Sequence, residues 1–273
     1  MAKKEAVVKA YKNQDFLNST SARTLRILSE FYEPESRFKK QNIVDTIVFF
    51  GSARLASKAE AQKKLRELKK LKNGKATEAK IKEAEIQLVM SKYYEDAVEL
   101  SKRLTEWSLG LDQEVKRFIV CSGGGPGIME AANKGAKLAG GTSIGLNISI
   151  PFEQFVNKYV KPDLAFEFHY FFMRKFWFIY LAKALIVFPG GFGTLDELME
   201  VLTLMQTGKI KKEMKVIVYD EHYWKKVLNF DALIEFGTIS KSDLKLFDFC
   251  NTVDDAFEKI TSHFKRHYLN RKA

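Results

Sequence analysis

The stretch ALIVFPGGFGTLDELMEVLTLMQTGK, residues 184–209, joins a continuous apolar run to a helical pattern through a turn that holds three glycines and a threonine. A continuous apolar run is typical of a strand that is covered on both faces of a parallel sheet. Leucine and methionine then recur at helical spacing. The stretch therefore predicts a strand, a glycine-rich turn and a helix, which together form the repeating unit of α/β folds.

Four further apolar runs repeat this pattern along the chain. They cover residues 45–53, 117–125, 142–151 and 215–224. Helical stretches lie between them, such as GIMEAANKGAKLAGG at 127–141, which has an apolar, small-residue face and glycines at its end. We predict a doubly wound, mainly parallel Rossmann-like sheet with helices on both faces.

Two segments add helices to this core. Residues 1–40 predict an N-terminal helical extension, and residues 41–273 predict the Rossmann-like domain itself. Within that domain, residues 56–92 carry 11 Lys or Arg against five Glu, with leucine and isoleucine near helical spacing on both sides of Asn73-Gly74. This segment predicts a basic helical hairpin inserted after the first strand.

The basic hairpin has two possible interpretations. A charged helical hairpin is most often simply solvated, and nucleic-acid binding is the sharper alternative. Aromatic residues interleaved with the cations would favour single-strand binding, but residues 56–92 contain none. The next aromatic residue along the chain is Tyr93, just beyond the hairpin. We therefore expect a solvated hairpin, and nucleic-acid binding through residues 56–92 stays open.

The composition narrows the class of protein. Apolar residues make up 46% of the 273 residues, which is typical of a folded globular chain, and the net charge of +11 makes anionic partners natural. The two cysteines, Cys121 and Cys250, have no metal-ligand spacing, and the chain opens without an apolar signal segment. No charge-free apolar stretch reaches 18 residues. We expect a cytoplasmic protein without a membrane span.

Three of the predicted strands end in turns of glycine or other small residues. These turns are FGSAR at 50–54, SGGGPG at 122–127 and PGGFGT at 189–194. Ligands of open α/β sheets bind at the carboxyl ends of the strands, so we expect the three turns to form one crevice. Glycines let a phosphate approach the backbone, and the helix that follows offers free N–H groups. The crevice is suited to an anion.

The turns do not match two common phosphate-binding motifs. The dinucleotide motif needs a third glycine where Glu130 stands, and the following strand lacks the acidic residue that would bind the ribose. The ATP-binding loop needs Gly-Lys-Ser/Thr after its glycines, and neither glycine turn has it. NAD binding and ATP hydrolysis are therefore disfavoured.

Four motifs resemble one known family. GGGPGIMEAANKGA (123–136), GLNISIPFEQ (145–154), FFMRK (171–175) and PGGFGTLDE (189–197) are similar to the LONELY GUY (LOG)-type phosphoribohydrolases, many of them once labelled lysine decarboxylases. The resemblance covers roughly residues 40–235 and is strongest to the longer bacterial members. It implies an enzyme that hydrolyses the N-glycosidic bond of a nucleoside 5'-monophosphate such as AMP or a cytokinin riboside monophosphate. It further implies a homodimer or higher oligomer, with neither a metal nor an organic cofactor.

The resemblance also assigns roles to individual residues. It implies that Arg174 and Glu197 are catalytic, with Glu197 hydrogen-bonding the ribose hydroxyls or positioning water. Arg174 would orient phosphate or ribose, since a guanidinium does not lose its proton. The expected substrate-binding residues are Ser52, Gly124, Glu153, Lys175, Gly190, Gly191, Gly193, Thr194 and Thr203.

Other interpretations of the same residues remain. Thr194 and Glu197 have the spacing of a capping box, in which the carboxylate would only bind the backbone at the start of a helix. A non-catalytic nucleotide or molybdenum-cofactor carrier could have a similar fold and similar turns. A carrier has no chemical reason to keep Arg174 and Glu197 together, so this pair favours an enzyme.

Overall fold

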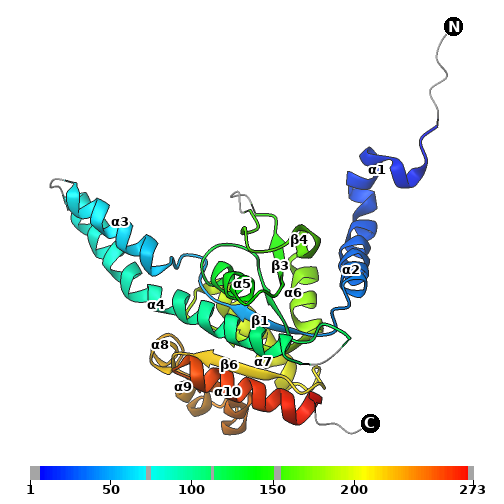
Figure 1. Ribbon diagram of the computed structural model, residues 1–273. Helices are drawn as coiled ribbons and strands as arrows, with labels where there is room; N and C mark the ends of the chain where they lie inside the picture. The colour runs from blue at the N-terminus through cyan, green and yellow to red at the C-terminus, as the bar shows by residue number, and fades with distance from the viewer. Residues whose placement is uncertain (1–6, 72–74, 112–113, 151–154, 270–273) are drawn as a thin grey trace.

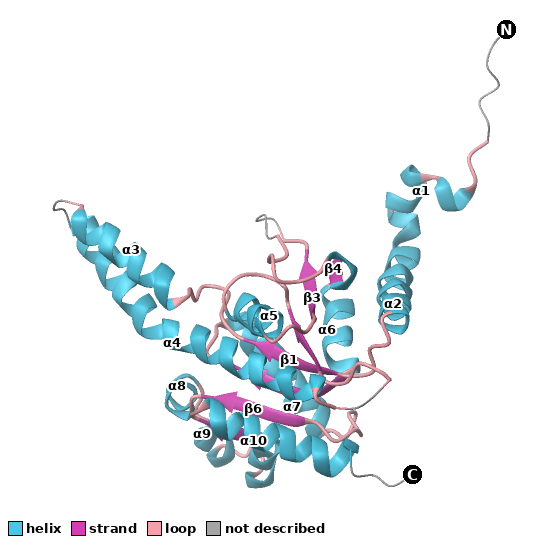
Figure 2. Ribbon diagram, viewed as in Figure 1, coloured by secondary structure: helices cyan, strands magenta, loops and turns pink. Residues whose placement is uncertain are grey.

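A seven-stranded, wholly parallel sheet forms the centre of the molecule in the computed structural model, which describes residues 7–71, 75–111, 114–150 and 155–269 (Figures 1 and 2). The strand order is β4-β3-β2-β1-β5-β6-β7. The strands are β1 (Thr46–Phe50), β2 (Ile119–Ser122), β3 (Ser143–Ile148), β4 (Ala165–Phe168), β5 (Ala182–Val187), β6 (Lys215–Tyr219) and β7 (Asp248–Cys250). This sheet confirms the predicted fold class.

Helices precede, connect and follow the strands. The α-helices are α1 (Gln14–Asn18), α2 (Arg23–Lys40), α3 (Lys58–Lys70), α4 (Lys75–Leu109), α5 (Ile128–Leu138), α6 (Phe171–Tyr180), α7 (Phe192–Gln206), α8 (Glu221–Val227), α9 (Phe230–Glu235) and α10 (Val253–Phe264). Short 3₁₀ turns lie at η1 (Ala10–Lys12), η2 (Thr20–Ala22), η3 (Pro162–Leu164) and η4 (Lys241–Leu246), and a π-helical turn, η5 (Lys265–Leu269), follows α10.

The helices cover both faces of the sheet and bury two separate apolar cores. Along β1, Ile47 and Phe49 pack into the core beneath α4, α5 and α10, whereas Val48 and Phe50 pack into the core beneath α2 and α6 to α9. Successive side chains of a strand point to opposite faces, so a continuous apolar run fills both cores at once. This arrangement explains why β1 reads as an uninterrupted apolar stretch.

The central strand β1 lies at the point where the strand order reverses. It pairs with β2 on one side and with β5 on the other, both in parallel. The chain leaves β1 toward one half of the sheet and later returns to build the other half from β5 onward. The loops that follow β1 and β5 therefore diverge at the carboxyl ends of these two strands. Doubly wound sheets form their ligand crevice at this place.

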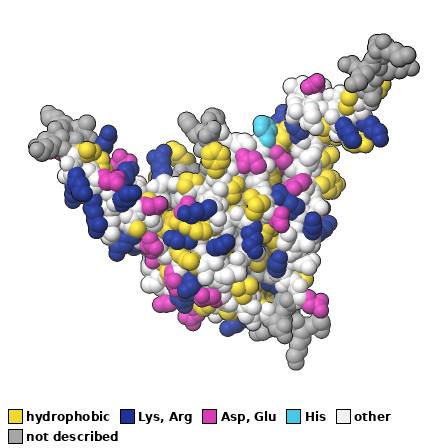
Figure 3. Space-filling model, turned by 45° about the horizontal axis from the view of Figure 1, so that its top comes forward, with side chains coloured by type: hydrophobic (Ala, Val, Ile, Leu, Met, Phe, Trp, Pro, Cys, Tyr) yellow, Lys and Arg dark blue, Asp and Glu magenta, His cyan; other side chains and the backbone are white. Residues whose placement is uncertain are grey.

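The predicted basic hairpin consists of α3 and the first part of α4, and it projects from the body of the protein (Figure 1). The Asn73-Gly74 turn expected between them lies outside the described residues. Helix α4 does not stop near residue 92 but continues to Leu109 and packs on α5 and α10. Lys and Arg side chains lie along the projecting arm (Figure 3). The hairpin and the core thus share one continuous helix.

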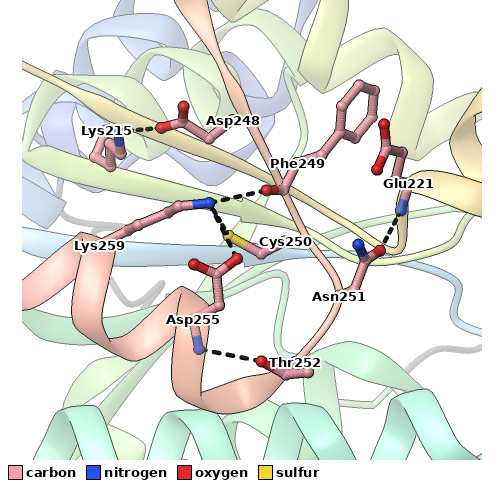
Figure 4. A network of polar contacts seen from close by, with 9 residues as sticks. All are labelled: Lys215, Glu221, Asp248, Phe249, Cys250, Asn251, Thr252, Asp255 and Lys259. Atoms are coloured by element: carbon pink, nitrogen blue, oxygen red, sulfur yellow. Dashed lines mark hydrogen bonds and ion pairs between the residues drawn. The ribbon is translucent and has the colours of Figure 1, made fainter.

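Two short strands were missed by the sequence analysis. Strand β4 has four residues and β7 only three, and both are edge strands. Polar contacts hold β7 in place (Figure 4). Lys259 of α10 donates to the carbonyl oxygen of Phe249 at 3.1 Å, and the Asn251 side chain accepts the Glu221 backbone N–H at 2.9 Å. Runs this short give no periodic signal, so contacts from other elements define them.

Across the described segments of the chain, no helix is both long enough and apolar enough to cross a membrane.

Candidate functional site

A cavity of about 840 Å³ opens at the carboxyl ends of β1 and β5. Its lining includes the turn after β1, the turn after β5 and the first residues of α7. Helices α4, α6 and α8 contribute side chains from the sides. The cavity therefore occupies the position where the strand order of the sheet reverses.

Backbone hydrogen bonds join the three small-residue turns into one unit. The N–H of Ser52 donates to the carbonyl oxygen of Pro189 at 3.0 Å, and the N–H of Ile128 donates to the carbonyl oxygen of Ser52 at 3.1 Å. Gly127 has a φ of +70°, and a β-carbon there would lie 2.2 Å from the Ser52 oxygen. Only glycine fits this position, which lets the second turn approach the first.

The start of α7 lies on the cavity wall. Its N-cap residue is Gly191, which has no side chain that could cap the helix. The first four N–H groups of a helix lack intrahelical partners and carry a partial positive charge. Gly191, Phe192 and Gly193 are exposed here, whereas Thr194 is buried. This end of α7 therefore presents backbone N–H groups without intrahelical partners, which suit an anion.

The capping-box interpretation of Thr194 and Glu197 is wrong. The helix begins at Phe192, so Thr194 already lies in its first turn and is not the N-cap. The Thr194 side chain packs over Gly190, where an added β-carbon would lie 2.1 Å from the threonine hydroxyl. Glu197 lies another three residues into the helix. Its carboxylate is consequently free of the backbone at the helix start.

Arg174 and Glu197 meet inside the cavity. Arg174 comes from α6 and Glu197 from α7, and their Nη2 and Oε1 atoms are 3.8 Å apart. The Glu197 residue is only 4% exposed. Among the described residues, neither the second oxygen, Oε2, of Glu197 nor the Nε of Arg174 has a hydrogen-bond partner. Buried polar atoms are almost always paired, so these two atoms indicate a place for a ligand or for water.

Burial controls the ionisation of this pair. It raises the pKa of Glu197 to about 7, although the positive charges of Arg174 and Lys175 act in the opposite direction. Burial likewise lowers the pKa of Arg174, against the attraction of Glu197. An arginine nonetheless keeps its charge at neutral pH. The cavity therefore holds a permanent cation beside a carboxyl group that can take up or release a proton near pH 7.

The structure brings most of the predicted site residues together. The cavity lining includes Ser52, Arg174, Gly190, Gly191, Gly193, Thr194 and Glu197. Glu153 lies outside the described residues. Gly124 is not part of the lining, although its neighbour Gly123 is. The carbonyl oxygen of Gly124 instead accepts hydrogen bonds from the backbone N–H and the side chain of Asn157.

Two other predicted contacts point elsewhere. Lys175 forms ion pairs of 2.8 Å with both Asp196 and Glu200 on the outer side of α7. Thr203 is exposed, and its hydroxyl donates to the carbonyl oxygen of Met199 within the same helix. Residues 174 and 175 are consecutive on a helix and so point in different directions, which separates Lys175 from the cavity.

Sequence reasoning missed several residues of the cavity wall. They include Arg54, Met90, Phe171, Tyr223 and Val227. Arg54 stands inside the motif FGSAR, and this place at the carboxyl end of a predicted strand was its signal in the sequence. Met90 and Val227 belong to α4 and α8, far along the chain from any glycine turn. Only the folded arrangement places these two side chains at the site.

Comparisons with known proteins agree with the motifs. A family model described as possible lysine decarboxylase matches residues 129–260. A probable cytokinin riboside 5'-monophosphate phosphoribohydrolase of Oryza sativa subsp. japonica is 28% identical over 177 residues, which are 64% of this chain and 66% of that protein. A cytokinin riboside 5'-monophosphate phosphoribohydrolase of Arabidopsis thaliana is 32% identical over 87 residues, which are 32% of this chain and 40% of that protein. Each match thus spans less than two thirds of the relative's length.

Solved structures show only a distant likeness. The molybdenum cofactor carrier protein of Chlamydomonas reinhardtii aligns over 81% of this chain and 99% of its own, with 20% identity and a TM-score of 0.44. The molybdenum cofactor binding protein of Rippkaea orientalis aligns over 62% and 86%, with 20% identity and a TM-score of 0.45. At these values the likeness says nothing about function.

The parallel sheet and the cavity at its switch point define a Rossmann-like α/β protein with a glycine-turn site. The family model and the sequence relatives make the assignment more specific. Over the matched residues the chain is similar to the LOG-type phosphoribohydrolases and to the family described as possible lysine decarboxylase.

Proposed function

We propose that this protein hydrolyses the N-glycosidic bond of a nucleoside 5'-monophosphate, releasing the free base and ribose 5-phosphate. The observation that carries the proposal is the buried Arg174–Glu197 pair, which lies beside the exposed amide groups at the start of α7. One wall of the cavity thus offers an anion site, and the next offers a carboxyl group with a pKa of about 7. The names of the sequence relatives point to the same chemistry.

The geometry suggests which residues would bind the phosphate and which would contact the sugar. The 5'-phosphate would bind the N–H groups of Gly191, Gly193 and Thr194, which favours a dianion over a neutral sugar. Glu197 lies about 4.5 Å further along the helix axis than Thr194, because the helix rises about 1.5 Å per residue. A sugar whose phosphate is held at the helix start would therefore lie within reach of the Glu197 carboxyl group.

The reaction needs a group that tolerates positive charge on the sugar. As the bond between the anomeric carbon and the base nitrogen breaks, its electron pair leaves with the base and the sugar gains oxocarbenium character. An ionised Glu197 stabilises that charge and accepts a proton from the attacking water, whose oxygen bonds to the anomeric carbon. The departing base takes up one proton from the solvent, and Glu197 afterwards returns to the solvent the proton that it accepted, so the products are the neutral base and ribose 5-phosphate. Arg174 keeps Glu197 oriented and partly ionised.

Product analysis tests the proposal directly. Purified protein is incubated with AMP, a cytokinin riboside monophosphate and a panel of other purine and pyrimidine monophosphates, and free base is measured by chromatography. We expect release from at least one of them. Binding of a nucleotide without any release would instead indicate a non-catalytic carrier, and absence of both would end the nucleotide assignment.

A variant pair separates catalysis from folding. Glu197→Ala should lower kcat by about a hundredfold or more, because a positioned acid–base group contributes 10²–10⁴-fold. Glu200→Ala removes a carboxylate from the same helix one turn on, outside the cavity lining, and should retain its rate. Both variants should unfold cooperatively. Full activity in Glu197→Ala would remove this carboxylate from the mechanism.

A further inference from the structure

Few charged side chains line the cavity. Within the described part of the chain they are Arg54, Arg174 and Glu197. Arg174 is next to Glu197, so the two charges largely offset one another whenever Glu197 is ionised. A phosphate dianion at the start of α7 would then meet only about half a positive charge from the helix. The remaining cation on the cavity wall is Arg54.

We propose that Arg54 is a phosphate-binding residue of this site and makes the site selective for phosphorylated ligands. The proposal rests on the function proposed above, because it assumes that the anion binds at the start of α7. Arg54 belongs to the turn after β1, across the switch point from the turn after β5. A ligand between the two turns would contact the α7 amide groups on one side and a guanidinium group on the other.

The backbone of Arg54 is held firmly although its side chain is exposed. Its N–H donates to the Ser52 hydroxyl at 3.1 Å, and the Ser52 N–H donates to the Pro189 carbonyl oxygen at 3.0 Å. The next residue, Leu55, is buried in the core beneath α4. These contacts fix the position of Arg54 relative to the glycine turn, so little backbone order is lost when a ligand binds.

A second observation points to a ligand at the same place. Glu197 is buried and faces the cavity, and its Oε2 atom has no hydrogen-bond partner in the described portion of the protein. The start of α7, an unpartnered buried carboxyl oxygen and Arg54 therefore border one cavity. A phosphorylated sugar supplies groups for all three, with its phosphate between Arg54 and α7 and its hydroxyls toward Glu197. A guanidinium fork binds two phosphate oxygens at once, which an ammonium group does not.

Binding of ribose 5-phosphate tests this role without any need for turnover. Calorimetry would compare ribose 5-phosphate with ribose for the wild type, Arg54→Gln, Arg54→Lys and the control Arg66→Gln. Arg66 is an exposed arginine of α3, outside the cavity lining, and its replacement changes the net charge by the same amount. All measurements use about 0.15 M salt, at which long-range effects of surface charge are screened.

We expect Arg54→Gln to weaken binding of ribose 5-phosphate by at least tenfold, Arg54→Lys to recover part of the loss, and Arg66→Gln to bind like the wild type. For a hydrolysed nucleoside monophosphate, Arg54→Gln should raise KM by a similar factor and change kcat much less. Melting temperatures of all variants should match, because Arg54 is exposed.

The outcomes separate this proposal from the proposed function. If the wild type binds ribose 5-phosphate and Arg54→Gln binds it equally well, Arg54 is not a phosphate ligand, whatever the enzyme hydrolyses. Equal losses in Arg54→Gln and Arg66→Gln would show a general charge effect and also refute the contact. If the wild type binds ribose 5-phosphate in an Arg54-dependent way but releases no base, the contact stands and the glycosidase activity fails. A wild type that binds no ribose 5-phosphate overturns the phosphate site together with Arg54.

Discussion

Glu197 is buried and lies beside a cation, and burial has the larger effect on its pKa. Its pKa is raised from the ordinary 4.5 to about 7 despite the arginine 3.8 Å away. A carboxyl group kept in this state lowers stability at neutral pH, since an ionised, incompletely hydrogen-bonded group is buried. Proteins usually retain such residues where they serve a reaction or a ligand.

The pH dependence of stability should reveal this residue. Below about pH 4.5 Glu197 is protonated in the folded and unfolded states, so it contributes nothing. Between pH 4.5 and 7 the unfolded state releases the proton first, and stability falls as pH rises. Glu197→Gln lacks this fall. As pH rises from 4.5 to 8, the free energy of unfolding of the variant should therefore increase by about 3 kcal/mol relative to that of the wild type. Urea denaturation across this range measures the difference. Parallel curves for the two proteins would contradict the raised pKa.

Two glycines of the same turn should respond differently to alanine. At Gly190 a β-carbon would lie 2.1 Å from the buried Thr194 hydroxyl, so Gly190→Ala should lower the free energy of unfolding by about 1–3 kcal/mol. At Gly193 no atom of the described residues lies within 4 Å of an added β-carbon, so Gly193→Ala should leave stability equal or slightly higher. Ligand binding should nonetheless weaken in Gly193→Ala, because the added methyl group would occupy the space of the anion. Thermal denaturation and ribose 5-phosphate binding test the pair. Unchanged binding in Gly193→Ala would place the anion elsewhere.

At the scale of elements, a series of side-chain contacts connects the end of the basic hairpin to the glycine turn before α7. Tyr93 of α4 donates its hydroxyl to Asp220 at 2.8 Å, and Lys92 also reaches this carboxylate. Asp220 caps α8 by accepting the backbone N–H of Tyr223. The Tyr223 hydroxyl in turn donates to the carbonyl oxygen of Gly190 at 2.9 Å. Helix α8 thus braces the turn that precedes α7.

Removing the last contact of this series should loosen the glycine turn before α7. Tyr223→Phe deletes the hydrogen bond to Gly190, so we expect a several-fold higher KM for a nucleotide and a loss of about 1 kcal/mol of stability. Tyr219→Phe is the matched control, because its hydroxyl contacts Asp96 and not the turn. It should lose stability but keep its KM. Equal KM values in both variants would show that the brace does not affect binding.

At the scale of the whole molecule, exposed aromatic side chains gather on α2 and α6. Tyr32, Phe172 and Tyr180 are each more than half exposed. Next to them lies a second cavity of about 460 Å³, bordered by Phe172, Phe176, Tyr180 and residues of the 209–212 segment. Apolar patches of this kind commonly mark subunit interfaces.

We expect a homodimer that buries this patch. Light scattering after size-exclusion chromatography should give about twice the mass of the chain, and Phe172→Glu should shift the protein toward the monomer, since a charge would be buried in the interface. Val89→Glu, an exposed apolar position on α4 away from the patch, is the control and should remain dimeric. A monomeric wild type at micromolar concentration would contradict the expectation.

The sequence predicted the fold from its strongest repeating signals. Long apolar runs such as 184–187 mark strands that lie in both cores, so burial itself produces the pattern. The pair Arg174 and Glu197 followed from motifs, and the structure places both in one cavity. The spacing of Thr194 and Glu197 also allowed a capping box, and only the structure excludes it, because the helix begins at Phe192 after the N-cap Gly191. Met90 and Val227 were missed because their place at the cavity depends on how α4 and α8 pack.

The position of β1 in the sheet also determines when the protein can fold during its synthesis. This strand needs β5 as a neighbour, and β5 is not complete until residue 187. A nascent chain that has left the ribosome only as far as α6 therefore keeps one edge of its central strand unpaired and apolar. Until β5 arrives, that edge invites pairing with other chains, and a chaperone that shields it would protect the newly made protein from aggregation.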